Sequence, residues 1–77
     1  MDLDSIINKL IEKGDKSLKN FYQFHIIENS SFTQDFKKGM LFQFLLHLRH
    51  DKNLISMEEF DFLDKKISDD IDMKNEY

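Results

Sequence analysis

Hydrophobic positions recur along most of the chain at intervals of three and four residues, which is the period of an amphipathic helix. Four segments carry this pattern, and we expect helices over residues 3–13, 15–28, 33–50 and 57–72. Proline is absent and glycine occurs only twice, which disfavours strand-and-turn folds because these need several turn residues. The sequence therefore predicts an all-α fold, a small four-helix bundle-like domain over residues 1–77.

Polar residues and a glycine mark the ends of the first two predicted helices. Asp2 or Asp4 can cap the first helix and Asp15 the second, because a side-chain oxygen at this place accepts a free backbone N–H. Gly14 is expected to end the first helix, since glycine adopts the left-handed conformation found there. A turn is expected at residues 29–31.

The third predicted helix differs from the others because its apolar residues point in nearly every direction. They are Phe36, Met40, Leu41, Phe42, Phe44, Leu45, Leu46 and Leu48. A helix that is apolar almost all round belongs inside a protein, so we expect this one to be the central helix. It starts near Ser31 or Thr33.

The fourth predicted helix begins at a capping box, in which Ser56 and Glu59 can each accept the other's backbone N–H. Its predicted core stripe consists of Met57, Phe60, Leu63, Ile67 and Ile71. We expect residues 73–77 to be the frayed end of an acidic C-terminal tail.

A local resemblance covers residues 45–66. An Asn53-Leu54-Ile55-Ser56 turn is followed by Glu58-Glu59-Phe60, which resembles the helical hairpin of short C-terminal oligomerisation (SHOCT-type) domains. Asn53 stands where that pattern has glycine, and asparagine also permits a left-handed helix end. The resemblance implies a hairpin and self-association.

Composition and charge exclude several classes. Cysteine is absent, which excludes disulfides and thiolate metal sites. The net charge is −4, and no basic stripe of the kind that reads duplex DNA appears, so nucleic acid is not an expected partner. The longest apolar run, residues 40–48, is far shorter than the roughly 20 residues that span a bilayer. The N-terminus lacks the features of a secretory signal, so we expect a cytoplasmic protein without a membrane span.

Candidate metal ligands are few. His47 and His50 are three residues apart, Asp51 follows, and His25 is the other histidine. A structural zinc site needs four ligands, and these residues more simply suit a partly exposed helix end, where a positive imidazolium is favourable. The sequence therefore predicts neither a metal site nor a cofactor.

A polar stripe on the third predicted helix is a candidate docking surface. Gly39, Gln43, His47 and His50 fall within about 80° of one another around the helix. The alternative is that the stripe is simply where this helix meets solvent.

Three apolar residues fall outside the core stripes. Phe62 lies opposite Phe60 on the fourth helix, and Phe24 and Ile27 lie off the main face of the second, although residues 24–27 would also suit a strand. Exposed aromatic residues suit an interface, but isolated ones are common on any surface. The candidate partner-binding residues are therefore Phe24, Ile27, Gln43, His47, His50 and Phe62. We also expect a homodimer, because the other three short helices can scarcely cover the apolar surface of the third predicted helix.

The sequence favours binding over catalysis. It has no phosphate-binding loop, nucleophile elbow or cysteine, so we expect no enzyme. Richness in Asn, Lys, Ile, Asp and Phe resembles accessory proteins of phages and other mobile elements, which inhibit or redirect a host protein. A bacteriocin-immunity-type helical protein and a small transcriptional regulator are the alternatives.

Overall fold

The computed structural model describes residues 1–28 and 31–74, and its regular secondary structure within these ranges is entirely helical. The all-α prediction is therefore confirmed. Four continuous helical stretches in the described residues correspond to the four predicted helices. The chain divides into two compact units, Met1–Ser31 and Phe32–Tyr77, and each is described by itself. That both units form one domain stays a prediction.

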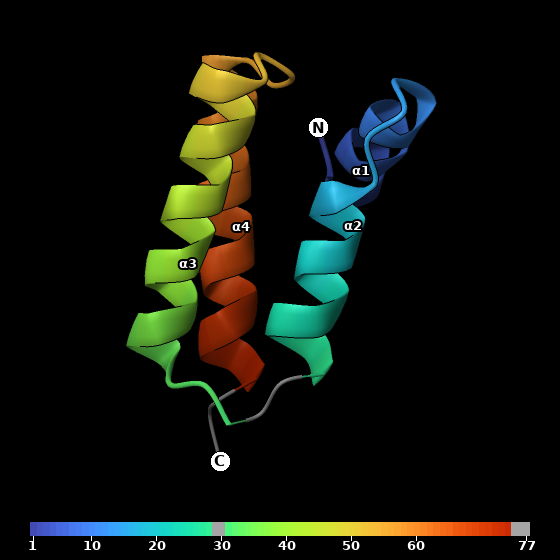
Figure 1. Cartoon of the computed structure of the whole chain (residues 1–77). Coiled ribbons are helices and arrows are strands. Elements are labelled where there is room, and N and C mark those ends of the chain that lie inside the picture. The colour runs from blue at the N-terminus through green and yellow to red at the C-terminus, as the bar shows by residue number, and fades with distance from the viewer. Residues whose placement is uncertain (29–30, 75–77) are drawn as a thin grey trace. The chain divides into compact units, whose positions relative to one another are not determined.

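The first helix is α1 (Leu3–Glu12), labelled in Figure 1. It has the two end signals that the sequence indicated. The Asp2 carboxylate accepts a hydrogen bond from the Ser5 N–H at 2.8 Å. This bond stabilises the charged carboxylate and therefore holds the pKa of Asp2 below its ordinary value. Beyond the helix, Gly14 has a φ of 87°, a left-handed conformation that glycine adopts without steric cost, and its N–H donates to the Ile11 carbonyl at 2.9 Å.

The second helical stretch consists of α2 (Ser17–Phe21) and a π-helical continuation, η1 (Tyr22–Glu28). It starts two residues later than predicted, and its N-cap residue is Lys16, which makes no side-chain capping bond, and not Asp15. The Asp15 carboxylate lies in the preceding turn and accepts the Ser17 N–H at 2.8 Å. Residues 24–27 are helical, so the strand alternative is wrong. Of the expected turn, residues 29 and 30 lie outside the described residues.

The C-terminal unit is an antiparallel helical hairpin (Figure 1). Its first arm is α3 (Gln34–Leu46) with a π-helical continuation, η2 (His47–Asp51), and its second arm is α4 (Met57–Lys74). Thr33 caps α3, since its Oγ1 accepts the Phe36 N–H at 3.2 Å.

The turn of the hairpin follows the sequence signals. Asn53 has a φ of 52° and takes the left-handed conformation that the resemblance implied. The Ser56 N–H donates to Glu59 Oε1 at 2.8 Å, and the Glu59 N–H donates to Ser56 Oγ at 3.1 Å, so the predicted capping box is formed. The fourth helix extends to Lys74, two residues further than predicted, so the expected tail is wrong for residues 73 and 74, while residues 75–77 lie outside the described residues.

The buried apolar residues follow one stripe on each helix, apart from Ile55, which precedes α4. In the N-terminal unit they are Ile6, Leu10, Leu18 and Ile26, and in the C-terminal unit they are Leu41, Leu45, Leu48, Ile55, Phe60, Leu63, Ile67 and Ile71. The predicted stripe of the fourth helix is correct except at Met57, which is 57% exposed. Met57 stands in the first turn of α4, about 60° around the helix from Phe60, where the hairpin offers it little cover.

The third helix is more exposed than its sequence predicted. Leu41, Leu45 and Leu48 are buried, but Phe36 is 53% and Phe42 46% exposed. Within its own unit α3 packs against a single helix, α4, which covers one side of it. Apolar residues on the other side are therefore left open.

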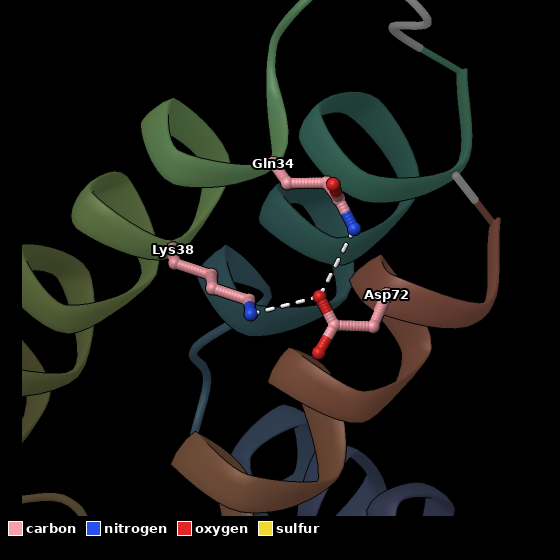
Figure 2. A network of polar contacts seen from close by, with 3 residues as sticks. All are labelled: Gln34, Lys38 and Asp72. Carbon is pink, nitrogen blue, oxygen red and sulfur yellow. Dashed lines mark hydrogen bonds and ion pairs between the residues drawn. The ribbon is translucent and has the colours of Figure 1, made fainter. Parts of the chain in front are cut away.

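A polar cluster joins the open ends of the two hairpin arms (Figure 2). Asp72 Oδ1 accepts a hydrogen bond from Gln34 Nε2 at 3.1 Å and forms an ion pair with Lys38 Nζ at 2.8 Å. The hydrogen bond to Asp72 stabilises the charged ammonium and raises the pKa of Lys38 above its ordinary value. Asp72 therefore ties the last turns of α4 to the first turns of α3.

Candidate functional site

A groove of about 420 Å³ runs between α1 and the second helical stretch in the N-terminal unit. It is lined by Asp4, Ile7, Asn8, Ile11, Lys19, Tyr22, Gln23 and Ile27. Side chains three and four residues apart share one face of a helix, and both walls of the groove have this spacing. The groove is therefore a product of two regular helix faces.

The α1 wall adjoins the stripe with which α1 enters the core. Ile6 and Leu10 are buried, whereas Ile7 and Ile11, one position further along, are half-buried and line the groove. Consecutive residues of a helix are about 100° apart, so α1 can bury one stripe of residues in the core and line the groove with the adjacent stripe.

The second wall consists of one row from α2 and η1. Lys19, Gln23 and Ile27 follow each other at intervals of four, with Tyr22 beside them. The Gln23 side chain donates to Glu28 Oε1 at 3.0 Å, which fixes the amide at the edge of the groove.

The groove has an apolar floor between two polar rims. Ile7, Ile11 and Tyr22 are half-buried, and Ile27 extends the floor with 40% of its surface exposed. On the rims, Asp4 and Asn8 on α1 are exposed, as are Lys19 and Gln23 on the other side. The two rims therefore carry opposite charges.

Two of the candidate residues predicted from the sequence lie on η1. Ile27 lines the groove, whereas Phe24 is 56% exposed and is not part of its lining. The Phe24 ring meets the His25 ring edge-on, with a centroid distance of 5.0 Å.

Three further candidates share the exposed face of α3 and η2. Gln43, His47 and His50 are all exposed, as is Gly39, so the predicted polar stripe faces solvent. His47 Nδ1 lies 2.8 Å from Asp51 Oδ2, one helical turn further along. In residues 1–28 and 31–74, no three metal-ligating side chains gather into a cluster.

Phe62, the last candidate, is half-buried and not fully exposed as the sequence suggested. It lines a hollow of about 300 Å³ with Lys65, Lys66 and Asp69 of the same helix. The two lysines follow Phe62 by three and four residues, and their aliphatic stems can cover part of the ring. Phe62 belongs to the C-terminal unit and Phe24 and Ile27 to the N-terminal one.

Sequence reasoning missed the groove, although its signal was present. Asp4, Ile7, Asn8 and Ile11 repeat at helical spacing beside the core stripe of α1, and Lys19, Gln23 and Ile27 do so on the next helix. A second row of this kind becomes a groove only when another helix runs beside it. The π-helical geometry of η1 and η2 has no comparable signal in the sequence.

Within the described part of the chain, no helix combines the length and apolar character that a bilayer crossing requires. Comparisons with protein-family models, with curated proteins and with solved structures find no match to this chain.

Proposed function

We propose that this chain is a protein-binding module that takes an amphipathic helix of another protein into the groove between α1 and the second helical stretch. The observation that supports this proposal is the apolar floor of the groove between two polar rims. Amphipathic helices dock in grooves of this kind, with their apolar face on the floor and their polar flanks on the rims. Binding, and not catalysis, is the proposed activity.

The dimensions and charges of the groove describe its ligand. The α1 wall extends over eight residues, from Asp4 to Ile11, which is about 10 Å, or two turns of helix. A ligand helix of this length presents apolar residues at positions i, i+3 or i+4, and i+7. An acidic side chain of the ligand suits the rim at Lys19, and a basic one suits the rim at Asp4.

The kind of partner follows from composition alone. Richness in Asn, Lys, Ile, Asp and Phe without proline resembles small accessory proteins of mobile elements. We therefore propose that the partner is a cytoplasmic host protein that the chain inhibits or redirects.

The test is affinity purification from the native host with three baits, followed by mass spectrometry. The baits are the wild-type chain, Ile27→Ser in the groove, and Phe24→Ser one turn away on the same helix, where the exposed ring lies outside the groove. A partner held in the groove is captured by the wild type and by Phe24→Ser and is lost from Ile27→Ser. A partner captured equally by all three baits, or by none, contradicts the proposal.

A further inference from the structure

Two phenylalanine rings stand exposed on the same outward side of α3, and each has a second ring behind it. Phe36 is 53% exposed, and its ring centroid lies 5.0 Å from that of Phe32. Phe42 is 46% exposed and meets Phe60 of α4 in a T-shaped contact at 5.9 Å. Rings supported in this way lose little freedom when something covers them, which is a property of interface anchors.

Gly39 lies between these two rings on the helix face. Glycine within a helix is less stable than alanine, so its presence needs a reason. The described residues give none, because a Cβ built at Gly39 would have no atom of theirs within 4 Å. A helix face with a bare backbone that is open to solvent suits the close approach of another helix.

The spacing around Gly39 is symmetric. Phe36 precedes it by three residues and Phe42 follows it by three, so the rings stand about 4.5 Å along the axis and about 60° around it on either side. A two-fold axis through Gly39 therefore places a phenylalanine of one copy against a phenylalanine of the other. Self-complementarity of this kind is what a symmetric dimer requires.

We propose that a second copy of this chain covers this face, with the two α3 helices crossing antiparallel at Gly39. In this arrangement Phe36 of one copy meets Phe42 of the other. Asp35 and Gln43, four residues before and after Gly39, likewise meet across the axis and can form a hydrogen bond. A parallel crossing would instead set Asp35 against its own copy, and like charges repel.

The interface is small and goes beyond the proposed groove, which lies in the other unit. A single pair of helices buries less than the roughly 1,200 Å² of a stable interface, so the dimer dissociates on dilution. The expected homodimer thus forms through α3, and not through Phe24, Ile27 and Phe62.

The first experiment is sedimentation equilibrium of the full chain from about 1 to about 500 µM, a range in which small interfaces dissociate. The wild type changes from monomer to dimer in this range. Phe36→Ser and Phe42→Ser each raise the dissociation constant about tenfold or more, as anchor residues do. Gly39→Gln raises the dissociation constant similarly. It does not lower the melting temperature, because glutamine is a better helix former than glycine. Phe24→Ser, equally exposed but in the other unit, leaves it unchanged.

A wild type that stays monomeric throughout overturns the proposal, as does a Phe24→Ser variant that dissociates as readily as Phe36→Ser. Circular dichroism confirms that each variant is folded.

The second experiment tests the antiparallel direction with single cysteines, which the native chain does not contain. Asp35→Cys and Gln43→Cys are oxidised separately and as a mixture. The antiparallel crossing gives cross-linked dimers mainly in the mixture, between the two different variants, because a disulfide needs Cα atoms within about 7 Å. Cross-linking of each variant mainly with itself overturns the proposed direction.

Discussion

Leu45 and Phe36 lie on opposite sides of α3 and should respond differently to the same substitution. Leu45 is fully buried, whereas Phe36 is more than half exposed. Leu45→Asp is expected to lower the free energy of unfolding by about 3–5 kcal/mol, because it leaves a charge in the core without a partner. Phe36→Asp should change it by less than about 1 kcal/mol.

Thermal unfolding followed by circular dichroism at low protein concentration measures both. Equal melting temperatures for Leu45→Asp and Phe36→Asp would show that α3 does not bury the side on which Leu45 lies. Phe44, on the helix that the sequence predicts to be central, is half-buried, so Phe44→Asp is expected to have an intermediate effect.

Asn53 occupies a left-handed conformation at the hairpin turn. Asn53→Gly is expected to keep or slightly raise the melting temperature, because glycine adopts this conformation freely. Asn53→Val should lower the stability by about 1–2 kcal/mol, because a β-branched side chain collides with the backbone there. Equal melting temperatures for the two variants would contradict a left-handed residue at this position.

Single residues were predicted from the sequence where a local rule governs them. Asp2, Gly14 and Asn53 act through their own backbone or that of a near neighbour, so their roles could be read directly. Met57 and Lys37 could not, because their burial depends on what lies beside them. Met57 is exposed at the start of a core stripe, and Lys37 is 3% exposed despite its charge.

At the scale of elements, the contact of Asp72 with Lys38 joins the two arms of the hairpin at its open end (Figure 2). Because the pKa of Lys38 is raised in the folded chain, this contact stabilises the hairpin fully below the ordinary lysine value of 10.5. The stabilisation is lost as pH rises through the folded-state pKa. The Asp72→Asn variant should therefore have a lower melting temperature than the wild type at neutral pH. The difference between the two melting temperatures should shrink in strongly alkaline solution.

Thermal denaturation of the two proteins side by side tests this dependence. Lys65→Gln, at an exposed position of α4, is the control, because it removes one lysine charge and leaves the contact of Asp72 with Lys38 in place. A difference between wild type and Asp72→Asn that stays the same at every pH would show that the Lys38 charge contributes nothing.

The elements themselves were well predicted because their ends carry local signals. All four helical stretches end within two residues of the expected places, and the Ser56–Glu59 pair caps as expected. The π-helical segments η1 and η2 were not foreseen. They widen a helix without changing its hydrophobic period enough to be recognised in a short segment.

At the scale of the molecule, the two units offer different surfaces. The N-terminal unit has a groove with an apolar floor, and the C-terminal unit has an open side of α3 with two exposed rings. The sequence indicated apolar residues beyond the core but not where they gather, because a groove depends on which helices run side by side. Ile27 was the one candidate that the groove includes.

Hydrogen–deuterium exchange of this chain, with and without the captured partner, tests whether the groove binds a helix of another protein. Exchange reports which backbone amides become protected. We expect new protection in residues 4–11 and 19–27, with little change in α4, and we expect this protection to be lost in the Ile27→Ser variant. Protection confined to α4, or none at saturating partner, would contradict it.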